Sequence, residues 1–325
     1  MPANLLKCLL GFLLGILSFL GFLVNLLVLV PVFRFAFVQN KSPIYLLSFI
    51  NIIIDMANLL MTTFYLAPTI ILDSYLNEDS KAGGFSKAMG SLFMFFWYLG
   101  SITQMVMAVN RLVVIHFRRN DIFIRKNIGY LYSAIIPLCT MLMYLAQYHF
   151  PCCAFVFDHM VLSYSYNQID DLDNYPNRFI DLPLNITSTS TALVSYSVIV
   201  WTVRKSKSST SVAITSRKQK RNREFSYALQ FSAISMFYTF SWIGFRVLPM
   251  IIGNGNGRLE WFVTISIAVV INNSANALVY LASNREVQQY LKTSGLIFKM
   301  FPRASSTQTS RDLPPLPPPR APRAP

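Results

Sequence analysis

Seven apolar stretches, each long enough to cross a bilayer, run along this chain of 325 residues and limit what it can fold into. A helix needs about 20 apolar residues to cross the hydrocarbon core. We expect spans at residues 9–33, 45–71, 93–115, 128–148, 184–203, 225–252 and 261–281. The fifth is the least apolar, because hydroxyl residues run from Thr187 to Thr191. The sequence therefore predicts an all-α membrane protein, a bundle of seven transmembrane helices.

The basic residues lie mostly on one side of these spans. Of 28 Lys and Arg residues, 21 fall in segments 34–41, 116–127, 204–224 and the stretch after 282, and five fall in the segments on the other side. Positively charged short loops stay in the cytoplasm, so we expect the N-terminus outside and the C-terminus inside. We interpret these charges as contacts with the lipid bilayer and expect no nucleic-acid partner, because they occur in short loops between spans.

Polar side chains recur inside the predicted spans, where each needs a partner. Asn25 lies in the first span, Asp55 in the second, and Asn272, Asn276 and Tyr280 in the seventh. The last three are spaced four residues apart and share a helix face. We expect Asn25, Asp55 and the seventh-span asparagines to form one cluster. Two roles are open for it: a switch filled by water or by a sodium ion at Asp55, or static hydrogen bonding between helices.

The outer half of the sixth span carries the main ligand-binding candidates. Arg246 lies seven residues before Gly253, which is about 10 Å below the outer end at 1.5 Å per residue. Trp242 lies one turn further in and faces the same way. If that face looks inward, Arg246 could hold an anionic or carbonyl-bearing ligand, with Phe93 as a further contact. The alternative is that Arg246 extends to the outer headgroups.

The inner end of the third span carries a charge in an otherwise apolar segment. Asn110 and Arg111 close this span, and Glu224 begins the sixth span at a similar depth. A charge within a span is costly and usually has a function. A salt bridge between Arg111 and Glu224 would tether the two helices. The alternative is that Glu224 only stabilises the first turn of its own helix.

Cysteines and a glycosylation sequon lie on the predicted outer side. Cys152 and Cys153 follow the fourth span, and Cys8 is the other outer cysteine. Either adjacent cysteine could form a disulfide, but neighbours rarely bridge each other, and the partner stays open. Asn185 begins an Asn-x-Thr sequon next to the fifth span. No residues have metal-ligand spacing, and we expect no cofactor.

Five motifs occur in order along the spans, together with three further segments. The motifs are Gly21–Asn25, Asp55, Asn110–Leu112, Tyr238–Gly244 and Asn276–Tyr280, and the segments are Ala108–Arg111, Pro151–Asp158 and Arg217–Glu224. The motifs resemble those of rhodopsin-like seven-transmembrane G-protein-coupled receptors. The segments are most similar to nematode serpentine chemoreceptors of class X or XA.

This resemblance implies an external small-molecule ligand and a heterotrimeric G protein inside. It implies that helix six moves outward, frees Arg111 for the G protein, and involves Glu224, Asn276 and Tyr280 in the switch. The chain departs from the family where Asn110 replaces an acid, so basal activity could be raised. Prolines are replaced at Gly244 and Ala277, and no cysteine near the outer end of helix three can make the family's usual disulfide.

Beyond the seventh span we expect a short amphipathic helix over 284–300 and a disordered proline-rich cytoplasmic tail over 301–325. Leu313–Arg320 favours polyproline II and contains SH3-type patterns, so an SH3-type adaptor is a candidate partner. We place the protein in the plasma membrane, with a sensory cilium as the more specific hypothesis. It lacks a nucleophile–base pair, so we do not expect an enzyme. A transporter or channel and a non-signalling scaffold acting through the tail are the alternatives.

Overall fold

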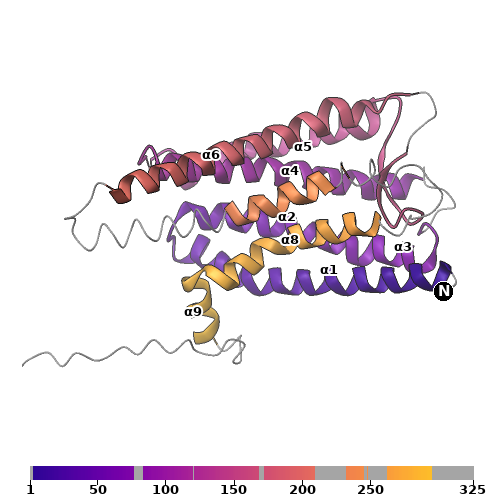
Figure 1. Ribbon diagram of the computed structural model, residues 1–325, viewed down its shortest axis with the longest axis horizontal. Helices are drawn as coiled ribbons and strands as arrows, with labels where there is room; N and C mark the ends of the chain where they lie inside the picture. The colour runs from indigo at the N-terminus through magenta and orange to yellow at the C-terminus, as the bar shows by residue number, and fades with distance from the viewer. Residues whose placement is uncertain are drawn as a thin grey trace, which may run out of the picture.

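The computed structural model is a bundle of long helices that lie side by side (Figure 1). It describes residues 3–76, 83–119, 121–167, 172–208, 232–244, 247 and 262–294. The labelled helices are α1 (Ala3–Phe33), α2 (Pro43–Met61), α3 (Ala67–Leu72), α4 (Gly84–Ile115), α5 (Arg125–Tyr144), α6 (Leu182–Ser208), α8 (Val263–Ser283) and α9 (Arg285–Thr293). Residues 232–244 form a further helix, drawn in orange between α4 and α8.

Four π-helical turns extend or join these helices: η1 (Arg34–Val38), η2 (Thr62–Leu66), η3 (Leu145–His149) and η4 (Asn177–Asp181). The turn η2 runs directly into α3, where Pro68 occupies the first turn. Proline has no N–H to give to a helix, so a change of hydrogen-bond register before it is expected. As a result α2, η2 and α3 form one continuous span.

Five described segments are long and apolar enough to cross a membrane: Leu5–Val38, Pro43–Leu72, Gly84–Ile115, Arg125–His149 and Val263–Ser283. They overlap the first, second, third, fourth and seventh expected spans, and most extend beyond the expected ends. The fifth span corresponds to α6, whose hydroxyl residues lower its hydropathy. The sixth, expected over 225–252, is described as helix over 232–244.

The helix α4 occupies the centre of the bundle, because it packs against α2, α5, α6 and the first strand. The helix α1 packs against α2, α3 and α8. Its other face exposes a row of large apolar side chains, which include Leu9, Phe12, Ile16, Phe19 and Leu23. Such a face fits contact with lipid, since a contiguous apolar surface of this kind is unfavourable in water.

One β-hairpin covers the end of the bundle at which the chain begins. Its strands β1 (Phe155–Asp158) and β2 (Ser163–Tyr166) are antiparallel, with Phe155 opposite Tyr166. The hairpin contacts α4 through β1 and α8 through β2. The hydroxyl of Ser266 on α8 donates to the backbone oxygen of Leu162 at 3.2 Å. The sequence analysis did not predict this hairpin.

The expected short amphipathic helix after the last span is α9, which turns away from α8 at the far end of the bundle (Figure 1). The side chain of Asn284 caps it by accepting from the backbone N–H groups of Glu286 and Val287, both at 3.1 Å. Val287 and Leu291 are buried against the bundle. The remainder of the expected 284–300 segment after residue 294, and the proline-rich tail, lie outside the described residues.

Candidate functional site

A pocket lies beside the hairpin, between α4, α6, α8 and the helix over 232–244. It encloses about 470 Å³, part of which is open to solvent. We call it the aromatic pocket, and its walls are Phe93, Met94, Trp97, Phe155, Tyr164, Tyr166, Asn177, Asp181, Asn185, Ser241, Trp242 and Val269. Apolar walls with a few polar groups are typical of small-molecule sites. The predicted contacts Phe93 and Trp242 both line it, and Arg246 lies outside the described residues.

Stacked rings join α4 to the hairpin across the aromatic pocket. The ring centroid of Phe93 lies 4.5 Å from that of Tyr164, 5.5 Å from that of Phe155 and 5.9 Å from that of Trp97, with the planes close to parallel. Offset stacking of this kind adds to the stabilisation that burial provides. The hairpin therefore forms one wall of the pocket.

A buried carboxylate lies where η4 meets α6. Asp181 accepts hydrogen bonds from Tyr98 of α4 at one oxygen and from Tyr166 of β2 at the other. A carboxylate taken out of water needs such donors. The sequence did not single out Asp181, because it reads as one of several acidic residues in its loop. Only the fold distinguishes it, by placing two tyrosine hydroxyls against it.

The side chain of Asn185 connects three elements beside Asp181. Its amide N–H donates to the backbone oxygen of Asp181 at 2.7 Å. Its oxygen accepts from the indole N–H of Trp97 at 3.2 Å and from the hydroxyl of Tyr238 at 2.5 Å. Asn185 is 3% exposed, and this burial argues against the glycosylation that its sequon allows. A glycan on the amide nitrogen would have to occupy space that the helices fill.

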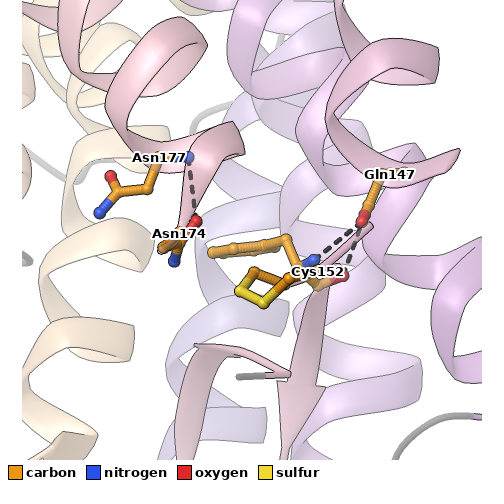
Figure 2. The surroundings of a disulfide bond; sticks show 6 residues. Gln147, Cys152, Asn174 and Asn177 are labelled. Carbon is orange, nitrogen blue, oxygen red and sulfur yellow. Dashed lines mark hydrogen bonds between the residues drawn. A yellow bond between two sulfur atoms is a disulfide. The ribbon is translucent and has the colours of Figure 1, made fainter. Parts of the chain in front are cut away.

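The loop that leads into the hairpin is held at both Gln147 and the adjacent cysteines. Gln147 donates to the backbone oxygen of Phe155 at 2.9 Å and accepts from its backbone N–H at 2.8 Å. Cys152 and Cys153 form a disulfide with each other (Figure 2), and Cys8 is a free cysteine. The partner that the sequence left open is therefore the neighbouring cysteine, a pairing that is rare. The backbone of Cys153 has a positive φ of 78°, a conformation that the sequence alone does not predict.

A second cavity, more polar than the first, lies deeper in the bundle. We call it the polar cavity, and its volume is about 270 Å³, part of which is open to solvent. It is lined by Asn51, Ile54, Asp55, Asn58, Phe96, Trp97, Gly100, Ser101, Gln104, Tyr238, Asn272 and Asn273. Asp55 accepts from the amide of Asn51 at 3.0 Å and from that of Asn276 at 2.5 Å. The predicted pairing of Asp55 with the last span is therefore present.

The other members of the predicted cluster lie nearby with different partners. Asn25 donates to the backbone oxygens of Gly21 at 2.9 Å and Asn273 at 3.0 Å. Its side chain is therefore bonded to α1 and α8 and not to Asp55. Asn272 lines the polar cavity. Tyr280 lies further along α8, where its hydroxyl makes a short contact with that of Ser48. The structure thus brings these residues to one α1–α2–α8 interface, in several separate contacts.

Asn110 and Arg111 are both buried, each with 3% exposure, at the end of α4 opposite the hairpin. Glu224 lies outside the described residues, and so does the predicted Arg111–Glu224 salt bridge. His116 directly follows α4, and its ring nitrogen Nδ1 lies 2.8 Å from the hydroxyl oxygen of Thr202 on α6. Polar contacts therefore link α4 to α6 close to Arg111.

Comparisons with known proteins agree with this architecture. Residues 16–284 match the family model described as serpentine type 7TM GPCR chemoreceptor Srx. The crystal structure of squid rhodopsin superposes with a TM-score of 0.74 at 14% identity, over 91% of this chain and 87% of that chain. Identity this low shows a shared fold alone. No curated protein sequence matches. Because the family model spans most of the chain, this multi-pass membrane protein belongs to the Srx family of serpentine seven-transmembrane chemoreceptors, which are G-protein-coupled receptors and not enzymes.

Proposed function

We propose that this receptor detects an external small molecule in the aromatic pocket and activates a heterotrimeric G protein at the plasma membrane. The observation that carries the proposal is the placement of the aromatic pocket directly against the polar cavity. Trp97 lines both. A ligand held by Phe93 and Trp242 would therefore touch the wall of a cavity that contains Asp55. The N-terminus lies outside, in accordance with the distribution of Lys and Arg.

The activating movement is an outward displacement of the sixth transmembrane helix, of which residues 232–244 are described. Its Tyr238 and Ser241 are hydrogen-bonded to α4 and α8, respectively. A ligand shifts this helix if it binds the displaced arrangement more tightly than the resting one. The displacement exposes Arg111 to the G protein. Asn110 supplies no carboxylate to hold Arg111, which favours basal activity, while Glu224 is the proposed resting partner of Arg111.

The polar cavity serves as a switch in this mechanism. The cavity beside Asp55 has room for a water molecule or a sodium ion among polar groups, and this room supports the switch. Asn276 and Tyr280, on α8, would change partners as α8 adjusts. Sodium at Asp55 would then stabilise the resting state.

The test is nucleotide exchange on a panel of purified Gα subunits, with wild-type receptor and Arg111→Ala in membranes. Exchange above the receptor-free rate that Arg111→Ala removes would support coupling and identify the Gα class. Exchange that is equal in both would exclude coupling through Arg111. Absence of exchange with every subunit would leave two possibilities, a receptor that is silent without its ligand or the transporter or channel alternative, and substrate flux into proteoliposomes is the assay that separates them.

Three finer assignments stay predictions from sequence. Arg246 is proposed as a contact for an acidic or carbonyl group, so Arg246→Ala should weaken the response to an acidic ligand more than to a neutral one. An SH3-type adaptor would bind the tail over 313–320. Location in a sensory cilium is the third. All three depend on residues or conditions beyond the described structure.

A further inference from the structure

The aromatic pocket and the polar cavity meet at one hydrogen-bonded junction. Asn185 lines the aromatic pocket, while Ser101 and Tyr238 line the polar cavity. The hydroxyl of Tyr238 lies 2.7 Å from that of Ser101 and donates to the Asn185 oxygen at 2.5 Å. All three residues are buried. A change at Asn185 therefore reaches the polar cavity through Trp97 and Tyr238, which both donate to its oxygen and line that cavity.

The Asn185 oxygen already has two donors, which use both of its lone pairs. A third donor must displace either Trp97 or Tyr238. The indole N–H of Trp97 has no other hydrogen-bond partner in the part of the chain that the structure describes, so its displacement would leave a buried donor unsatisfied. The hydroxyl of Tyr238 would keep its contact with Ser101. Tyr238 is therefore the donor that is replaced at lower cost.

Tyr238 also belongs to the helix whose displacement is proposed to activate the receptor. Its ring stacks on Trp97 with centroids 5.6 Å apart, and this contact together with the bond to Asn185 holds the helix against α4 and α6. Loss of the bond to Asn185 would weaken that attachment on the side that faces the aromatic pocket. A ligand donor at this oxygen would thus favour release of the helix.

We infer that the aromatic pocket takes a small aromatic ligand with a hydroxyl or N–H group, and that this group acts by replacing the Tyr238 hydroxyl on the Asn185 oxygen. The inference rests on the proposed function for the site, and it adds the ligand class and the residue that selects it. The stacked faces of Phe93 and Trp97 accept the ring. The Asn185 oxygen selects for a donor, because only a donor can take the place of the Tyr238 hydroxyl there.

The test uses 4-methylphenol and 4-methylanisole, which differ in the presence of a donor, as probes for the purified full-length receptor. Ligand-observed NMR titration measures both dissociation constants without any G protein. Tyr238→Phe removes the competing hydroxyl, so the affinity for 4-methylphenol should rise by about threefold to tenfold, the range for one neutral hydrogen bond. The affinity for 4-methylanisole should not change.

Asn185→Leu removes the acceptor and should lower the affinity for 4-methylphenol to that for 4-methylanisole. Tyr144→Phe is the matched control, because Tyr144 is 57% exposed on α5 and away from the junction. If Asn185→Leu does not fold, Tyr238→Phe carries the test alone, since it removes one oxygen and keeps the ring.

Equal affinities of the wild type for the two probes would overturn the inference. So would the absence of binding by either probe up to its solubility limit, or an unchanged affinity for 4-methylphenol in Tyr238→Phe. These outcomes are distinct from failure of the proposed function. If the receptor binds 4-methylphenol more tightly than 4-methylanisole but drives no exchange on any Gα subunit, the proposed coupling fails and the inferred ligand class stands.

Discussion

Gly90 of α4 lies so close to Phe155 of β1 that a β-carbon at Gly90 would be 1.9 Å from the Phe155 backbone oxygen. The same β-carbon would be 3.1 Å from the Gln147 amide nitrogen, which donates to that oxygen. A backbone oxygen cannot move aside as a flexible side chain can. The bare α-carbon of Gly90 is therefore what allows the hairpin to lie against α4 and form a wall of the aromatic pocket.

Gly90→Ala should displace the hairpin and weaken ligand binding while the helical bundle persists. The added methyl group must separate β1 from α4, which breaks the Gln147–Phe155 hydrogen bonds and the stack on Phe93. We expect at least a tenfold loss of affinity for an aromatic probe, corresponding to about 1.4 kcal/mol, with a lower thermal midpoint. Gly129→Ala on α5 is the control, because nothing lies within 4 Å of its β-carbon position. Normal probe binding by Gly90→Ala would contradict the close contact between the hairpin and α4.

Gly21 permits a second close approach, between α1 and α8. A β-carbon there would be 2.3 Å from the Ser274 hydroxyl oxygen and 3.4 Å from Leu59. Gly21→Ala should therefore destabilise the receptor by about 1–3 kcal/mol, as overpacking does. Ser274→Ala removes the clashing oxygen and should restore most of the loss in the double variant. Thermal unfolding of the four combinations measures this coupling, and purely additive effects would argue against the contact.

Asn185 should carry no glycan, although it begins a sequon. Its amide nitrogen donates to Asp181 and its oxygen accepts from Trp97 and Tyr238 inside the bundle. Digestion of the folded receptor from eukaryotic cells with a peptide N-glycosidase should leave its electrophoretic mobility unchanged. Thr187→Ala, which removes the sequon and keeps Asn185, should migrate like the wild type. A shift in either experiment that corresponds to a glycan at Asn185 would contradict the burial of this side chain.

The apolar runs of the sequence predict the spans. The sequence also predicts that Asp55 meets asparagines of the last span, because a polar group inside a bilayer needs a partner and few are available. It does not predict the hairpin. The four-residue strands are too short for a clear pattern, and their position depends on Gly90, which is distant in sequence. The burial of Asn185 is not predicted for the same reason. A sequon is a local pattern, whereas the burial of its asparagine depends on Trp97 and Tyr238 from two other helices.

Sodium should lower basal nucleotide exchange in the wild type if the polar cavity is a switch. Asp55 is the carboxylate of that cavity, and its amide partners Asn51 and Asn276 can rearrange around a cation. Asp55→Asn keeps the shape and removes the charge, so exchange should become insensitive to sodium. Replacement of sodium by potassium at equal ionic strength is the control for screening. The same sodium response in both proteins would exclude Asp55 as the site and support static hydrogen bonding.

Tyr238→Phe should raise basal exchange even without a ligand. The variant loses the bonds to Asn185 and Ser101 and keeps the ring stacked on Trp97, so the helix over 232–244 is held less firmly against α4. Loss of about 1 kcal/mol from the resting state would raise the active population about fivefold while that population is small.

Arg111→Ala in the same chain should abolish the increase, which distinguishes a shifted equilibrium from damaged protein. Tyr144→Phe should match the wild type, and a Tyr238→Phe receptor with unchanged exchange and normal stability would show that this junction does not hold the resting state.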